Sequence, residues 1–488
     1  MTSNSLGSAE LAAGTAIRAA KEVPAYREFL RGQGLLEKVL SGHFSFAGLP
    51  LTDKESYLSR AAHKNFIASS MRPGIRGGLL SSGSSGSRFC WPRQSQENSS
   101  LDLKKWLDEM FGCSGKKTLF VVSLAMEGWN AGINTARHVH LACEQSGGRH
   151  SCAFPGLDYN MAIRLISAMG RGYDMIVVFI YPTAIGHLLR TAERMGLRLP
   201  LKKMRFGVTG DPFSEKFREN LDRTCGIAWP EVSMAGYSYS SADTRIIGTE
   251  TRPAIAFRRL LAASASLQRA SGISSCVPNI YSLVPHEELQ LVENIEGELV
   301  FTRWQTAPLI RYNLHDRGLL WEYRETLKTI KEAELAADAA VYVRTLETGD
   351  SSRGLIGVYG RSNSEYFFGM YLEEEILSGF LQDARISPAL TGIFSVERKD
   401  IDGRERLVWE VETRCHEKGL EDQIRDVLLE KAAQAFPHFK VNLEGFLGSG
   451  NSDSVFQVKT LPYPELSSLM TVSAKYRPVK RKDLRGTI

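Results

Sequence analysis

The chain has 488 residues, of which 43% are hydrophobic and 24% charged, and its formal net charge is only +5. This composition is typical of a globular protein with two or more domains. The small, diffuse charge gives no reason to expect nucleic acid as a partner, and no apolar run approaches the ~20 residues that a transmembrane helix needs.

The N-terminus and the cysteines indicate a cytoplasmic protein. The first residues, Met-Thr-Ser-Asn-Ser, lack the basic and apolar parts of a secretory signal. The seven cysteines are odd in number, and no two have Cys-x-x-Cys spacing. We therefore expect reduced thiols and no zinc site.

The N-terminal part reads as helices followed by turns. Residues 9–40 show helical spacing that is interrupted at Val23-Pro24. A turn follows at residues 49–54, where Thr52 or Asp53 is placed to cap a short helix. Leu79-Leu80 then ends an expected buried strand.

Beyond residue 100, apolar strands alternate with amphipathic helices, which predicts an α/β fold with helix-covered, mostly parallel sheets. The expected helices are Leu101–Met110, Ala184–Met195 and Glu215–Arg223, and the expected strands are Lys117–Ser123, Asp174–Ile180, Met204–Val208, Glu298–Thr302 and Leu309–Arg311.

The pattern changes near Gly360, which predicts a large domain at 1–358 and a small α+β domain at 359–488. For the small domain we expect a helix at Leu420–Ala435 and strands at Ile393–Glu397, Leu407–Thr413, Lys440–Phe446 and Ser454–Lys459.

A loop rich in serine and glycine follows Leu79-Leu80 and reads Ser-Ser-Gly-Ser-Ser-Gly-Ser-Arg over residues 81–88. Its glycines allow tight turns that aim backbone N–H groups at an anion, and Arg88 adds a fixed positive charge. The loop is therefore a candidate phosphate site, although a flexible linker has the same composition.

Three later stretches carry candidate ligand-binding groups. Phe206–Pro212 is a strand that runs into a glycine turn with a carboxylate. Gly236–Thr244 places an aromatic ring four residues before a carboxylate, which suits base stacking and magnesium. Arg311–Asp316 ends a strand with an aspartate that can bind a sugar diol. Taken singly, each is also explained by a βα turn, a buried tyrosine or a capping aspartate.

In their order along the chain these stretches, together with three others, resemble one family. The others are Val23–Arg27 followed by Leu49–Lys54, Gly297–Thr302, and the Gly-Arg-Ser sequence at 360–362. The family is that of the adenylate-forming ligases (the ANL superfamily), in particular its phenylacetate–CoA ligase-like and coenzyme F390 synthetase-like branch. The resemblance implies a large N-terminal domain and a mobile C-terminal lid that turns about residues 360–362.

The resemblance also implies roles for individual residues. Tyr239 would stack on adenine, Asp316 would hold the ribose hydroxyls, and Asp243 would bind Mg²⁺. The full implied ATP set is Ser82, Gly83, Ser84, Ser85, Gly86, Gly210, Asp211, Pro212, Tyr239, Ser240 and Asp316. The implied catalytic residues are Arg88, Arg361 and the lid lysine Lys475, for which Lys480 is the alternative.

The stretch Leu124–Gly132 lies where the family places its acid pocket. Met126, Trp129 and Tyr237 suit a planar aromatic acid, with Asn130 or His138 near its carboxylate. The alternative is that Met126 and Trp129 are core residues.

The expected activity is ATP-dependent formation of an acyl-AMP, followed by transfer to a second nucleophile. The family implies ATP, Mg²⁺ and the CoA thiol, but the segment after residue 362 that shapes thiol entry is shortened in this chain. An amide synthetase, a carrier-protein loader and a nitrite-activating diazotase remain alternatives, as does a non-catalytic nucleotide-binding homologue. The expected partners are small molecules, with a monomer or homodimer equally compatible with the sequence.

Overall fold

The structure, a computed structural model, describes most of the chain. The described residues are 2–80, 89–94, 103–126, 130–210, 213–273, 277–333, 335–336, 339–361, 366–367, 370–372, 374–401, 404–414, 417–436, 439, 455–468 and 479–480.

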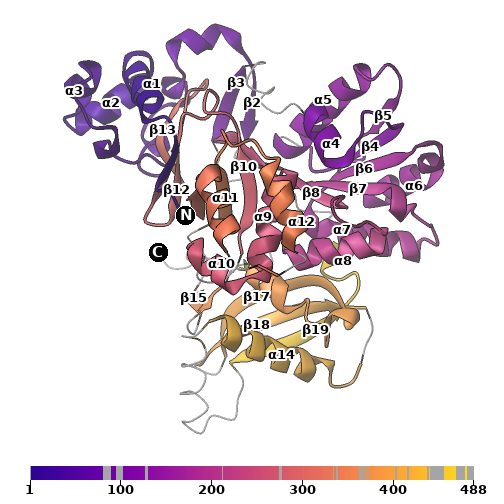
Figure 1. Cartoon of the computed structure of the whole chain (residues 1–488). Helices are drawn as coiled ribbons and strands as arrows, with labels where there is room; N and C mark the ends of the chain where they lie inside the picture. The colour runs from indigo at the N-terminus through magenta and orange to yellow at the C-terminus, as the bar shows by residue number, and fades with distance from the viewer. Residues whose placement is uncertain are drawn as a thin grey trace.

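One long sheet organises the large domain (Figure 1). Within the described residues it has twelve strands, in the order β1-β11-β12-β13-β14-β10-β9-β8-β7-β6-β4-β5. Their bounds in that order are Ser5–Gly7, Leu291–Ile295, Glu298–Arg303, Leu309–Trp321, Leu355–Arg361, Asn279–Leu283, Arg245–Thr249, Met234–Ser241, Met204–Thr209, Met175–Ile180, Thr118–Ser123 and His150–Ala153.

The sheet is mixed. The pairs from β5 through β4, β6 and β7 to β8 are parallel, whereas the pairs from β8 to β1 are antiparallel. The α/β class is confirmed, but the expectation of mostly parallel sheets holds only for the first part. Parallel strands need crossover helices, whereas β11, β12 and β13 follow one another through short connections.

Helices cover the parallel part, whose strands β4, β6 and β7 are buried along their whole length. The helices of the large domain are α1 Ala9–Glu22, α2 Pro24–Gly32, α3 Leu36–Leu40, α4 Leu103–Phe111, α5 Asn130–Glu144, α6 Tyr159–Met169, α7 Pro182–Arg194, α8 Glu215–Cys225, α9 Arg252–Ala263, α10 Ala265–Ala270, α11 Tyr323–Glu332 and α12 Ala340–Glu347.

The interruption expected at Val23-Pro24 is present, because Pro24 is the first residue of α2. Of the two residues expected to cap a short helix, Thr52 does not cap one. Thr52 instead forms a parallel bridge with Tyr312 of β13. The Asp53 carboxylate accepts hydrogen bonds from Ser56 N (2.6 Å) and Oγ (2.7 Å), which shapes a turn before a 3-10 helix at Leu58–Arg60. Asp53, the other expected cap, thus bonds the N–H three residues further on, whereas Thr52 is committed to pairing with β13.

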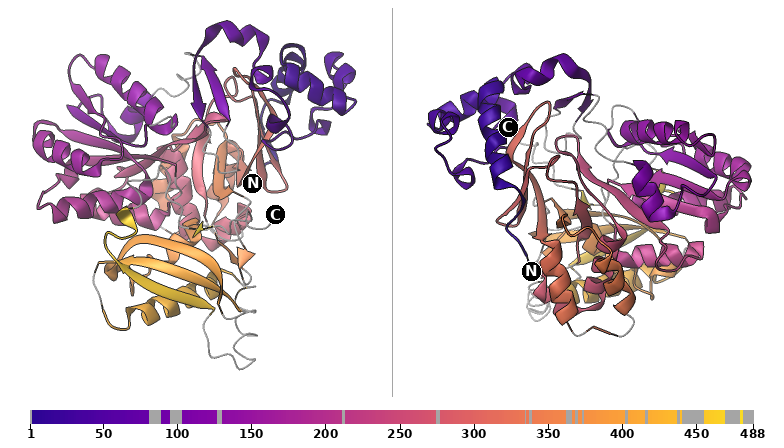
Figure 2. Two further views of the ribbon diagram at one scale, coloured as in Figure 1. Left: turned by 180° about the vertical axis from the view of Figure 1, so that it is seen from behind. Right: turned by 45° about the horizontal axis from the view of Figure 1, so that its top comes forward.

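The small domain has its own core. Its sheet, over the residues that are described, has the order β19-β18-β17-β20, with strands Phe456–Pro462, Arg404–Thr413, Leu390–Ile401 and Val479–Lys480. Helix α14 spans Leu420–Ala435, as expected, and buries Ile424 and Leu428 in the core cluster that also contains Trp409. The strand expected at Lys440–Phe446 lies outside the described residues. Figure 2 shows this domain beneath the face of the large domain that carries α7 and α8.

Five shorter elements are also present in the described residues: the strand pair β2 (Ile75–Leu80) and β3 (Cys90–Gln94), the pair β15 (Tyr366–Phe367) and β16 (Met370–Tyr371), and helix α13 (Glu374–Phe380). In the described part of the chain, no helix is long and apolar enough to cross a membrane.

Candidate active site

The two residues expected to hold adenine and ribose lie against each other. Tyr239 near the end of β8 donates a hydrogen bond from Oη to Asp316 Oδ2 on β13 over 2.7 Å. The Tyr239 ring also stacks on Tyr281, with centroids 5.7 Å apart and an interplanar angle of 26°. Asp316 pairs in register with Arg361 on β14. The sheet thus brings two expected ATP residues and the expected catalytic residue Arg361, all far apart in sequence, to one place.

Gly210 directly follows β7, the strand beside β8. Its φ is +92°, and an added Cβ would lie 3.0 Å from the Tyr181 ring, so only glycine suits the turn. Hydroxyl groups link it to β8. Thr209 Oγ1 lies 3.0 Å from Ser238 Oγ, which in turn lies 3.2 Å from Ser240 Oγ. Gly210 and Ser240, both expected ATP residues, therefore border the same strand ends.

Asp243, the expected magnesium ligand, lies in the turn after β8 and is only 2% exposed. Its Oδ2 accepts a hydrogen bond from Tyr312 Oη at 2.7 Å and lies 3.4 Å from Lys54 Nζ. Tyr312 and Asp316 are on the same strand, β13. Two tyrosine–aspartate hydrogen bonds of opposite direction therefore connect the β8 segment to β13: Tyr239 to Asp316, and Tyr312 to Asp243.

These surroundings do not suit a divalent cation bound directly by Asp243. A cation and a hydroxyl already contact one carboxylate oxygen, and the side chain is buried. Among the residues that the structure describes, no group of three or more His, Cys, Asp or Glu side chains is placed to hold a metal ion. The magnesium role of Asp243 stays a prediction from the resemblance, and the geometry favours a different role, developed below.

Three buried side chains that sequence reasoning missed hold the backbone of this turn. Gln305 donates to Asp243 O at 2.8 Å, Arg303 donates to Thr244 O at 2.6 Å, and Arg93 donates to Ala242 O. All three donors are at most 2% exposed. Buried amides and guanidiniums need such acceptors, but nothing local in the sequence indicates which carbonyls they meet.

Three of the expected acid-pocket side chains lie in the described part of the chain, on or beside β4, α5 and β8. Met126 is half-buried just after β4, and His138 is half-buried on α5. Tyr237 is a core residue: it is 5% exposed, its hydroxyl bonds with Thr135, and its ring packs edge-on against Phe179 at 5.3 Å. Burial raises the pKa of Tyr237 to about 12, so its hydroxyl stays protonated.

Several expected site residues lie outside the described part of the chain, and their roles stay predictions. They are Ser82, Gly83, Ser84, Ser85, Gly86, Arg88, Trp129, Asp211, Pro212 and Lys475, together with the side chains of Asn130 and Arg361. The backbone of Lys480, the alternative lid lysine, pairs with Glu397 of β17 in the small domain.

A buried ionic network on α8 and α9 was also not predicted from the sequence. Glu215 on α8 contacts Arg218 (2.9 Å), Arg258 (3.4 Å) and Arg259 (3.2 Å). Burial acts to raise the pKa of Glu215, but the three guanidiniums together lower it. Arg218 also contacts Glu250 at 2.5 Å, and Glu250 accepts a hydrogen bond from the backbone N–H of β8 at residue 236. The network therefore ties α8 and α9 to the strand that carries Tyr239.

The small domain contacts α7 of the large domain through Tyr463. The guanidinium carbons of Arg190 and Arg194 lie 5.2 and 4.9 Å from the centre of the Tyr463 ring. The Tyr463 hydroxyl lies 2.9 Å from Thr191 Oγ1, and Arg190 donates to Thr391 O at 2.9 Å. These contacts between the two domains are mainly polar, as is common at interfaces between domains of one chain.

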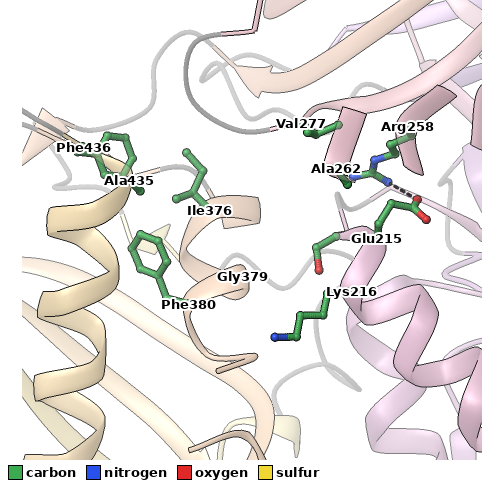
Figure 3. A pocket seen from close by; sticks show the side chains of 11 residues that line it. Glu215, Lys216, Arg258, Ala262, Val277, Ile376, Gly379, Phe380, Ala435 and Phe436 are labelled. Atoms are coloured by element: carbon green, nitrogen blue, oxygen red, sulfur yellow. Dashed lines mark hydrogen bonds and ion pairs between the residues drawn. The ribbon is translucent and has the colours of Figure 1, made fainter. Parts of the chain in front are cut away.

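Two cavities lie between the domains. One of about 590 Å³ is bordered by α7, α8 and the small-domain residues near Tyr463. The other, of about 300 Å³, is shown in Figure 3, where Phe380 and Phe436 of the small domain face Lys216 and the Glu215–Arg258 pair. The interface between the two domains is therefore not closely packed at these two places.

Known structures share this fold. A 2-hydroxyisobutyryl-CoA ligase, in the postadenylation state in complex with 2-HIB-AMP, is similar with a TM-score of 0.58 and 11% identity over 97% of this chain and 90% of that chain. The acyl acid amido synthetase AtGH3.15, in complex with 2,4-DB, is similar with a TM-score of 0.60 and 13% identity over 97% and 92%.

The expected fold is therefore confirmed and is shared with these two enzymes: a large α/β domain with a mixed sheet, followed by a smaller C-terminal sheet domain. No protein-family profile and no curated protein matches the sequence.

Proposed function

We propose that this protein is an ATP-dependent ligase that activates a carboxylic acid as an acyl-AMP, releases pyrophosphate, and passes the acyl group to a second nucleophile. The observation that carries the proposal is the contact between Tyr239 and Asp316 beside Arg361. The three residues come from separate strands and match a nucleotide: a ring for the base, a carboxylate for the sugar diol and a cation for the phosphates.

The adenylation step requires little covalent chemistry from the protein itself. The acid's oxygen attacks the α-phosphorus of ATP, the bond to pyrophosphate breaks, and the charge that develops must be neutralised. Asp316 would fix the ribose and so aim the α-phosphate. Arg88, Arg361 and Lys475 would supply positive charge, and departure of Lys475 with the lid would admit the second nucleophile.

The acceptor has two candidates, a thiol and an amine. The two similar structures are a CoA ligase and an acyl acid amido synthetase, and the fold serves both. CoA remains the first candidate from the resemblance. The shortened segment after residue 362 and the likeness to the amido synthetase support an amine as the second.

The test is ATP–pyrophosphate exchange across a panel of aryl acids, small hydroxy acids and nitrite. Exchange that depends on one of the carboxylic acids would support the proposal, and exchange that depends on nitrite alone would favour the diazotase alternative. ATP binding without exchange for any compound would favour a non-catalytic nucleotide-binding protein. Thioester and amide products of the active acid, formed with CoA or a panel of amines, would then distinguish the acceptors.

A further inference from the structure

The strongest unexplained feature near the nucleotide site is the ion pair between Lys54 and Asp243. The Lys54 side chain is 14% exposed, the Asp243 side chain is 3% exposed, and Nζ lies 3.4 Å from Oδ2. Two charges withdrawn from water are costly unless they neutralise each other and their remaining groups are hydrogen-bonded. Tyr312 supplies such a hydrogen bond to the same carboxylate.

Backbone pairing of the preceding residues with β13 places Lys54 beside Asp243. Thr52 N donates to Arg311 O at 3.0 Å, Asn313 N donates to Thr52 O at 2.8 Å, and Thr52 Oγ1 donates to Ile310 O at 2.8 Å. These bonds fix the segment along β13, two residues before Lys54. The lysine is therefore held by backbone geometry, which distinguishes it from a surface lysine that meets a carboxylate by chance.

The carboxylate is held just as firmly from the other side. Arg93, Gln305 and Arg303 bond the carbonyls of residues 242–244, so the turn has little freedom to carry Asp243 toward a bound nucleotide. Asp243 is thus fixed at a position where the positive charge that neutralises it comes from Lys54 of the same chain.

We propose that Lys54 is the resident counter-charge of Asp243, and that this pair positions the nucleotide-binding strand in place of a protein-bound magnesium ion. Asp243 and Lys54 are positioning residues. They keep Tyr312 hydrogen-bonded, which holds β13 and its Asp316 against the β8 segment and its Tyr239. The inference concerns the same site as the proposed function and rests on it for the identity of the nucleotide.

The chemical consequence is specific. Magnesium in such sites is commonly bound by substrate phosphates with one or two carboxylates. If Lys54 neutralises Asp243, loss of the Asp243 carboxylate changes the stability of the site and its affinity for ATP. The dependence of the reaction on magnesium concentration then stays unchanged. If Asp243 is a metal ligand, its loss raises the magnesium concentration that half-saturates the reaction.

The experiment compares Lys54→Met, Asp243→Asn and the double variant, with Lys105→Met as a matched control because Lys105 makes an ion pair with Glu109 at a 70% exposed position. Thermal unfolding without nucleotide and calorimetric ATP binding are measured for each variant. Half-saturating magnesium is taken from ATP–pyrophosphate exchange with an active acid.

We expect Lys54→Met to lower the melting temperature by several degrees and to weaken ATP binding at least tenfold, because it leaves a buried charge unpaired. The double variant should recover at least half of both losses, the control should match the wild type, and half-saturating magnesium in Asp243→Asn should stay within twofold of the wild type. If Lys54→Met does not fold, Lys54→Arg keeps the charge and should fold and bind ATP, whereas its failure would count against the ion pair.

Two results would overturn the inference. One is a tenfold or greater rise in half-saturating magnesium in Asp243→Asn. The other is strict additivity of the two substitutions in the unfolding experiment. The unfolding cycle needs no substrate, so it still tests the pair if no acid supports exchange and the proposed function fails.

Discussion

Replacing Asp316 by alanine should weaken ATP binding by about a hundredfold. A hydrogen bond to a charged group is worth about 1.5–3 kcal/mol, and the ribose diol offers two donors to one carboxylate. The net free energy of binding is smaller than this sum, because Asp316 Oδ2 already accepts a hydrogen bond from Tyr239 in the free protein. A net loss of about 3 kcal/mol is therefore reasonable, and each 1.4 kcal/mol is a factor of ten in affinity. Isothermal titration calorimetry with ATP measures it directly.

The nucleotide itself supplies the control. Binding of 2′,3′-dideoxy-ATP to the wild type should be weakened about as much as binding of ATP to Asp316→Ala, and combining both changes should cost little more. Tyr239→Phe, which keeps the ring, should lose no more than about tenfold. ATP affinity within twofold of the wild type in Asp316→Ala, or fully additive losses with the dideoxy analogue, would refute the assignment of the ribose to Asp316.

Three further outcomes are expected. Lys475→Ala should slow acyl-AMP formation by about a hundred- to a thousandfold, because about 3–4 kcal/mol of transition-state charge stabilisation is lost. The second step, started from synthetic acyl-AMP, should keep its rate. If acyl-AMP formation is lost only in Lys480→Ala, the role belongs to Lys480. Because the pKa of Glu215 is held below its usual value of 4.5, its contribution to stability is present above that pH and is lost as the pH falls through the lowered value. Glu215→Gln should accordingly cost about 3–5 kcal/mol at pH 7 and show a flatter acid limb in urea unfolding from pH 7 to pH 3; an unchanged acid limb would contradict the network's role. Tyr463→Ala removes the aromatic seat of the small domain, so small-angle scattering should show a larger radius of gyration without ligand, and an unchanged radius would mean that other contacts hold the lid.

The sequence by itself determined several local elements of the large domain and their order. Period-3.6 and continuous apolar patterns are local properties, so strands such as β6 and helices such as α8 were predicted within two or three residues of their observed ends. The same holds for α14, whose bounds agree at Leu420–Ala435. The ordered motifs also indicated the fold, because few chains carry so many matches in one sequence order.

Where local patterns compete with long-range pairing, the sequence was a poor guide. Thr52 has the side chain of a helix cap, yet three hydrogen bonds to β13 make it a strand residue. The mixed direction of the sheet was missed for a related reason. Strand direction depends on which strands become neighbours, and a strand's own residues carry little information about that choice.

Only the tertiary structure decided the charge balance of the candidate site. Sequence motifs single out Tyr239, Asp243 and Asp316, but they do not show that Tyr239 meets Asp316 or that Lys54 lies against Asp243. Such partners come from segments that are distant along the chain, and the fold brings them together. Whether a buried carboxylate has a metal ion or a lysine beside it depends on that geometry, because the cost of burying a charge depends on what surrounds it in space.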